Sequence, residues 1–116
     1  MKITFYQKSD GTKPVSEFLS ELDDDMRGKF AYVMTLLQEK GTSLRMPYSR
    51  PVDSGIFELR MKFGSDITRV LYFFVDGNEA ILTNGFVKKS EKTPQSEITL
   101  AKKYRDDYLS RKKEEE

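Results

Sequence analysis

The sequence contains no cysteine and no histidine among its 116 residues. The absence of cysteine excludes disulfide bonds, thiolate zinc sites and thiol nucleophiles. The absence of histidine removes the commonest general base and the commonest metal ligand. No apolar run approaches the ~18 residues of a membrane span, and no signal-peptide pattern opens the chain. We therefore expect a cytoplasmic protein that acts without a metal ion, a cofactor or a membrane.

The composition is that of one folded domain. Apolar residues make up 37% of the chain and aromatic residues 12%, which is too many for a disordered chain. The length fits a single domain over residues 1–116, because domains commonly run to ~100–150 residues. We find neither repeats nor a linker, and we expect only residues 110–116 to form a frayed tail.

Charge is unevenly distributed along the chain, although the net formal charge is only +1. Residues 16–25 carry five carboxylates and no cation, whereas residues 86–105 carry six cations and two carboxylates. Such separation gives a small domain a directional field. One side of the protein can then neutralise phosphates without the whole chain being basic.

The first half of the chain predicts a strand and two packed helices. Residues 2–6 alternate as a strand does, and Pro14 suits the first turn of a short helix. The run Asp23–Asp25 can cap a second helix that Gly41 ends. Residues 42–55 contain two prolines and show no period, so we predict an ordered loop there.

The second half predicts three strands and a last helix. Residues 56–63 alternate, with Phe57, Leu59 and Met61 on one face and charged residues on a solvated face. Residues 67–75 are nearly continuously apolar, which favours a central strand, and Asp76-Gly77 predicts a hairpin to residues 79–87. Thr93 as the cap and Pro94 at the first helical position open the last helix. The whole is an α+β fold in the order strand, helix, helix, three strands, helix, with an antiparallel sheet that the helices cover.

Arg69 is out of character in an apolar strand. Desolvating a guanidinium is costly unless it is paired or reaches water, so we place Arg69 near the open end of the sheet. If Asp76-Gly77 forms a two-residue loop, Arg69 lies opposite Asn84, and Lys88 shares the face of Asn84. These residues would form a pocket rim. The alternative of equal weight is an ion pair between Arg69 and Glu58 or Asp66.

Other cations and two tyrosines are candidates for an RNA site. Arg60 and Lys62 project from one face of their strand, which by itself is more often a solvated face than a binding site. Lys88, Lys89 and Lys92 precede a helix N-terminus, where N–H groups attract anions, although an ordinary polar loop is the alternative. Tyr72 and Tyr48 can stack on bases or pack in the core, and for Tyr72 core packing is the safer interpretation.

The motifs taken together resemble the HigB-like branch of the RelE/ParE toxin superfamily, many of whose members come from phages. The resemblance covers residues 14–108 and rests on four segments in order and at the right spacing. They are Pro47-Tyr48-Ser49-Arg50-Pro51-Val52, Gly55-Ile56-Phe57-Glu58-Leu59-Arg60, Arg69-Val70-Leu71-Tyr72-Phe73, and Gly85 to Pro94 continued by Glu97-Ile98 and Ala101.

The resemblance implies the toxin of a type II toxin–antitoxin pair with a RelE-like fold. Such a toxin enters the ribosomal A site and cleaves mRNA there, and its partner is a helix-turn-helix, HigA-like antitoxin. By resemblance Arg69 corresponds to the strand arginine that contacts the scissile phosphate. Arg60 and Lys62 fall where basic residues line the RNA path, and Lys88, Lys89 and Lys92 match basic residues after the last strand. Arg50, Tyr48 and Asn84 are further candidates for RNA binding.

The implied chemistry suits a site without metal or histidine. The 2′-OH of the RNA attacks the adjacent phosphate, which leaves a 2′,3′-cyclic phosphate and a free 5′-OH. Arg69 with Arg60 or Lys88 can stabilise the charge on phosphorus. A lysine among Lys62, Lys89 and Lys92, or Tyr72, is the candidate for the proton transfers. The alternatives are a ParE-like gyrase inhibitor, or a phage-derived binding module that has lost cleavage.

Overall fold

A computed structural model describes residues 1–88 and 92–115, apart from the side chain of Lys88. Five strands form one sheet in the order β1-β5-β4-β3-β2. The strands are β1 (Lys2–Phe5), β2 (Ser49–Asp53), β3 (Ile56–Phe63), β4 (Asp66–Val75) and β5 (Glu79–Lys88). The helices are α1 (Pro14–Ser20), α2 (Asp24–Lys40), the short 3₁₀ helix η1 (Gly41–Ser43) and α3 (Gln95–Glu115).

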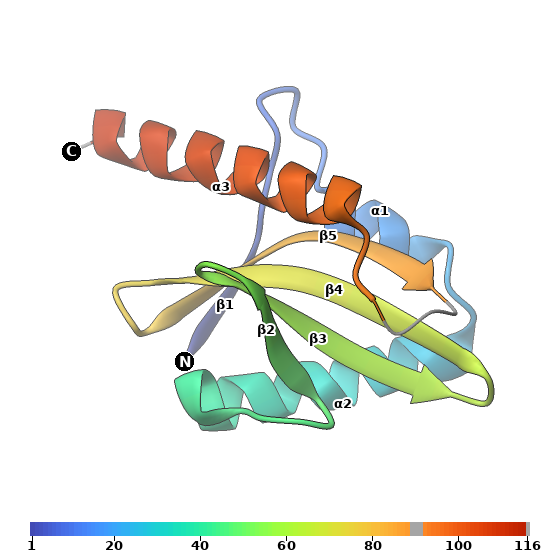
Figure 1. Cartoon of the computed structure of the whole chain (residues 1–116). Helices are drawn as coiled ribbons and strands as arrows, with labels where there is room; N and C mark the ends of the chain where they lie inside the picture. Colours follow the sequence, from blue (N-terminus) through green and yellow to red (C-terminus); the bar gives the residue numbers. More distant parts are fainter. Residues whose placement is uncertain (89–91, 116) are drawn as a thin grey trace.

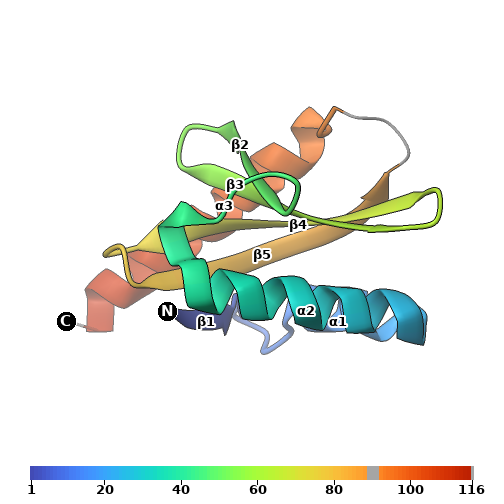
Figure 2. The ribbon, with the colours of Figure 1, turned by 90° about the horizontal axis from the view of Figure 1, so that it is seen from below.

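The sheet separates two cores. In Figure 1, α3 crosses one face of the sheet and α2 runs below the other, and Figure 2 shows α2 in front of the sheet when it is seen from below. The core on the α1/α2 side contains Val15, Phe30 and Tyr72, and the core on the α3 side contains Leu71 and Phe73. The α+β class is therefore confirmed, and the expected helices and strands follow one another in the expected order, with one additional strand, β2, before β3.

Helix α2 forms as its sequence predicts. The Asp23 side chain accepts a hydrogen bond of 2.8 Å from the Met26 amide, which satisfies one of the free donors at the helix start. Gly41 ends the helix with a φ of 54°, a conformation that glycine adopts without steric cost. Helix α1 lies close against the sheet, since a Cβ on Gly85 would come within 2.4 Å of the Phe18 ring.

Two predictions about the sheet are wrong. The segment expected to be a loop over residues 42–55 contains η1 and the edge strand β2, which pairs antiparallel with β3. Pro51 obscured this strand, although an edge strand tolerates proline because one side of its backbone needs no ladder partner. The sheet is also not wholly antiparallel, because β1 runs parallel to β5.

The pairing of Arg69 with Asn84 is also wrong in detail. The hairpin loop is one residue longer than expected, so Val75 pairs with Glu79, and the register shifts again beside Leu71. Arg69 therefore lies opposite Phe86, and Asn84 lies opposite Leu71. A register shift of one residue moves every side chain of the strand to the opposite face of the sheet. Two such shifts in succession return the side chains to the face that was expected. Arg69 and Asn84 consequently share a face of the sheet, as expected.

The C-terminal segment also differs from expectation. Residues 110–115, expected to be frayed, continue α3 to Glu115. Arg111 explains part of this order, because it donates to Asp107 one turn earlier and to the carbonyl oxygen of Gln7. No helix in the described part of the chain is both long enough and apolar enough to cross a membrane.

Candidate functional site

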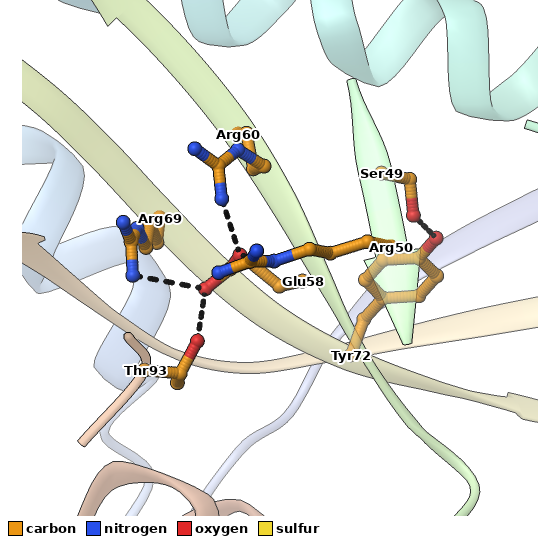
Figure 3. A network of polar contacts seen from close by, with 7 residues as sticks. All are labelled: Ser49, Arg50, Glu58, Arg60, Arg69, Tyr72 and Thr93. Atoms are coloured by element: carbon orange, nitrogen blue, oxygen red, sulfur yellow. Dashed lines mark hydrogen bonds and ion pairs between the residues drawn. The ribbon is translucent and has the colours of Figure 1, made fainter. Parts of the chain in front are cut away.

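A single buried carboxylate organises the polar residues beneath the start of α3. The side chain of Glu58 is 0% exposed. Its Oε2 atom accepts from Arg50 Nε at 2.8 Å and from Arg60 Nη1 at 3.2 Å. Its Oε1 atom accepts from Thr93 Oγ1 at 2.6 Å and lies 3.6 Å from Arg69 Nη1. Figure 3 shows these four side chains converging on Glu58 from different segments of the chain.

The sheet register brings the cluster together. Arg50 on β2 pairs with Glu58 on β3, and Arg60 on β3 pairs with Arg69 on β4. Directly opposite residues of neighbouring strands point to the same face, and Glu58 and Arg60 share a face because they are two residues apart. Two like charges in opposite positions repel each other, so the anion beside them stabilises the arrangement. The ion pair of Arg69 with Glu58, one of the two sequence-based alternatives, is confirmed.

The three guanidinium groups differ in their access to solvent. The side chains of Arg69, Arg60 and Arg50 are 0%, 10% and 29% exposed. The prediction that this face of β3 is solvated is therefore wrong for Glu58, which is buried, and Arg60 is almost buried as well. The reason is that α3 and Thr93 lie over this part of the sheet. Arg69 does not reach water, and a counter-ion takes the place of solvent. Among the described residues, three arginines therefore contact one carboxylate, and two of them have surface at the partly open end.

Two grooves adjoin this open end. One has a volume of about 440 Å³ and is lined by Arg50 and Val52 of β2 and by Lys92, Thr93 and Gln95 at the approach to α3. The other has a volume of about 120 Å³ and is lined by Arg60 and Lys62 of β3, with Met46, Pro47 and Ile67. Each partly exposed arginine thus borders a groove that also contains a lysine.

Asn84 lies on the same face but is engaged with α3. Its Nδ2 atom donates to the Glu97 carbonyl oxygen at 3.3 Å and to Glu97 Oε1 at 3.0 Å. Its Oδ1 atom accepts from Thr83 Oγ1 at 2.7 Å. Asn84 is 4% exposed. In this structure its amide fastens β5 to the first turns of α3, and an RNA contact by Asn84 stays a prediction.

The two candidate tyrosines differ in their relation to the arginine cluster, because Tyr72 lies on the opposite face of the sheet, whereas the carbonyl oxygen of Tyr48 accepts a hydrogen bond of 2.9 Å from the Arg60 amide. Tyr72 pairs with Phe57 and belongs to the core on the α1/α2 side, so its core packing is confirmed. Its hydroxyl lies 2.5 Å from Ser49 Oγ, and burial raises its pKa. Tyr48 is half-buried and meets Tyr32 edge to face with centroids 6.2 Å apart. The catalytic role predicted for Tyr72 would require it to act from the opposite face of the sheet.

The candidate lysines differ in whether the structure describes them and in where they lie. Lys62 and Lys92 are exposed beside the two grooves. The backbone of Lys88 pairs with Ile67 at the same end of the sheet as Arg69. Lys89 and the side chain of Lys88 lie outside the described residues, so their predicted roles are not tested. Among the described residues, no group of three or more histidine, cysteine or acidic side chains could hold a metal ion.

Thr93 and the central position of Glu58 were not apparent from the sequence. Thr93 was expected to cap α3, but its hydroxyl binds a carboxylate from β3 instead. A weak signal existed in Glu58 and Arg60, which share a strand face at a spacing of two residues. The contribution of Arg50 was hidden because β2 was not predicted.

The family of the chain follows from comparison with known proteins. Residues 17–106 match the family model described as phage-derived protein Gp49-like (DUF891). No curated protein sequence matches the chain. The matched segment extends from α1 to α3 and includes Arg50, Glu58, Arg60, Arg69 and Thr93. The chain therefore belongs to the phage-derived Gp49-like family, a toxin-like family related to RelE and ParE.

Proposed function

We propose that this protein is the toxin of a type II toxin–antitoxin pair, of the HigB-like branch, and that it cleaves mRNA on the ribosome. The observation that carries the proposal is the cluster of Arg50, Arg60 and Arg69 around Glu58, partly open beside two grooves. Membership of a toxin-like family supports it. The proposed partners are the ribosomal A site with its message and a helix-turn-helix antitoxin.

The cluster is suited to the charge that develops when a 2′-OH attacks a phosphate. Preorganised cations in a partly dehydrated site stabilise such charge more than mobile cations in water. Arg60 and Arg50 have exposed surface, so we assign the contact with the scissile phosphate to them. Arg69 is fully buried in this conformation and contributes through the electrostatic field behind them. This differs from the direct contact that the family resemblance implies for Arg69.

The proton transfers fall to a lysine in this proposal. Lys62 lines the groove of Arg60, and Lys92 lines that of Arg50, so either is placed to meet RNA held there. Tyr72 is less suited, since it lies on the other face of the sheet. Modest acid–base catalysis can suffice if the ribosome aligns the message, because positioning contributes as much as ~7–11 kcal/mol.

Inducible expression in bacteria tests the proposal. We expect the wild type to stop growth and to create new 5′ ends within translated messages, whereas a reporter without a start codon stays intact. Arg60→Ala should restore growth at equal protein level, because it removes a partly exposed cation from the cluster. The matched control is Arg27→Ala on α2, which should behave as the wild type. Normal growth with intact messages on wild-type induction would refute the proposal.

A non-catalytic function is the second candidate, and the placement of Tyr72 and Arg69 favours it. Neither side chain reaches the exposed surface of the grooves in this structure. A gyrase inhibitor related to ParE, or a phage-derived binding module, would need the basic surface without the proton transfers. Cleaved DNA and an SOS response, with messages intact, would identify the gyrase inhibitor in the same induction experiment.

A further inference from the structure

Four side chains contact the two carboxylate oxygens of Glu58, three of them by hydrogen bonds and Arg69 by an ion pair. An ionised carboxylate offers about four acceptor positions on its two oxygens. Arg50 and Arg60 contact one oxygen, and Thr93 and Arg69 contact the other. The side chain is 0% exposed. A charge buried in this way is stable only where such partners surround it.

These contacts and the complete burial of Glu58 argue against a role for it as the general base. A base must come within about 2.6–3.2 Å of the proton that it removes, with a free lone pair. Glu58 has no exposed surface, and the contacts with Thr93 and the arginines occupy both oxygens. Its carboxylate therefore lies behind the arginines and faces their guanidinium groups.

We propose that Glu58 is a positioning residue that fixes the orientation of Arg50 and Arg60 toward RNA phosphates. The inference deepens the proposed endonuclease function and rests on it. A guanidinium carries five N–H donors in a rigid fork, so it can bind a carboxylate on one edge and a phosphate on another. Arg50 donates to Glu58 through Nε, and Arg60 donates through Nη1. The same carboxylate, the anchor of the cluster, therefore holds the two guanidinium groups in different orientations.

The anchor also joins the sheet to the approach to α3. Thr93 donates to Glu58 across 35 residues of sequence, and Thr93 lines the groove that contains Arg50 and Lys92. The same carboxylate therefore fixes the positions of the arginine side chains and of Thr93, which forms part of the groove wall beside them. Loss of the anchor should misalign both without removing a single cation.

The variant Glu58→Gln distinguishes the orientation of the arginines from their electrostatic attraction for RNA. The substitution keeps the size of the side chain but removes its negative charge, so the cluster becomes more positive and RNA binding should hold or strengthen. The maximal cleavage rate of ribosome-bound message should fall by about 10- to 100-fold, because misplacing a catalytic group by ~1 Å has an effect of that order. The concentration for half-saturation should not rise.

Thr93→Val is the second variant, because Glu58→Gln removes a buried charge that three arginines contact and can impair folding. It removes one contact with Glu58 and no charge, so a several-fold lower maximal rate with unchanged half-saturation is expected. The chain provides matched controls in a second threonine–carboxylate pair, in which Thr4 Oγ1 lies 2.5 Å from Glu79 Oε2 on the β1/β5 side of the sheet. Glu79→Gln and Thr4→Val should cleave as the wild type does.

The arginine side chains give a readout that does not depend on cleavage. In NMR spectra of the wild type, the Nε–H signals of Arg50 and Arg60 should be dispersed and slow to exchange. In folded Glu58→Gln, or in Thr93→Val to a lesser extent, they should move toward the averaged position of solvated arginines. These changes, together with the selective loss of maximal rate, would establish the positioning role.

Four results would overturn it. One is a folded Glu58→Gln that cleaves at the wild-type rate, and another is a Thr93→Val that matches the wild type where Glu58→Gln does not fold. A third is a pH–rate profile of Glu58→Gln that loses its rising limb, which would make Glu58 the base. The last is a loss of rate that only tracks the unfolded fraction. An inactive wild type would instead refute the proposed function, and the NMR signals would still test the positioning.

Discussion

Glu58 and Arg69 are both fully buried, but their removal should have unequal effects on stability. Breaking a buried ion pair by removing one partner costs about 3–5 kcal/mol. Glu58→Gln removes the buried charge that all three arginines contact, whereas Arg69→Met removes one of these contacts and leaves Glu58 with Arg50 and Arg60. We therefore expect Glu58→Gln to lower the free energy of unfolding more than Arg69→Met does. Urea unfolding measures both, and the reverse order would contradict the view that Glu58 anchors the cluster.

At the scale of single residues, the sequence identifies Arg69 as unusual but does not predict the environment in which it lies. Arg69 stands out because a cation in an apolar strand requires a partner, and Glu58 was one of the two partners considered. The burial of the pair was not predictable, because it depends on Thr93 and α3 lying over β3. Nothing in the local alternation of β3 distinguishes a charged face under a helix from a charged face in water.

At the scale of helices and strands, patterns of period and capping predicted α1, α2, β3 and β4, and register was the weak point. A one-residue longer hairpin and a shift beside Leu71 each reverse the facing of side chains, and only their combination returned Asn84 to the face of Arg69. Strand β2 was missed because its five residues include Pro51 and show no clear alternation. That omission concealed the contact of Arg50 with Glu58.

The attachment of α3 to the start of the chain gives a pH prediction. Burial and the hydrogen bond to Asp107 raise the pKa of Tyr6 from 10.0 to about 12. A raised pKa means that Tyr6 binds its hydroxyl proton more tightly in the folded protein than in the unfolded chain. The contribution of Tyr6 to the free energy of unfolding is therefore complete below pH 10 and is lost as the pH approaches 12.

Urea unfolding of the wild type and of Tyr6→Phe across this range checks the prediction. The difference in unfolding free energy between the two proteins should shrink as the pH rises, since only the wild type loses the Tyr6 contribution. A constant difference from pH 10 to 12 would show that the hydrogen bond to Asp107 does not hold α3 in the expected way.

The whole molecule separates its charges across the sheet. The acidic run of residues 16–25 lies in and between α1 and α2 and is largely exposed, whereas the arginine cluster lies on the α3 side. A field of this kind orients an approaching polyanion, and its effect weakens as salt rises. The polarity was evident from the sequence, but only the fold shows that the sheet lies between the two charged regions.

The central claim is that the Glu58-centred arginine cluster cleaves ribosome-bound message. The most direct measurement incubates the purified chain with a defined mRNA, alone and on ribosomes, and analyses the ends of the products. We predict cleavage only on ribosomes, with 5′-OH and 2′,3′-cyclic phosphate ends, and a strongly reduced rate for folded Arg60→Ala. A message that stays intact on ribosomes, or cleavage that Arg60→Ala leaves unchanged, would contradict the claim.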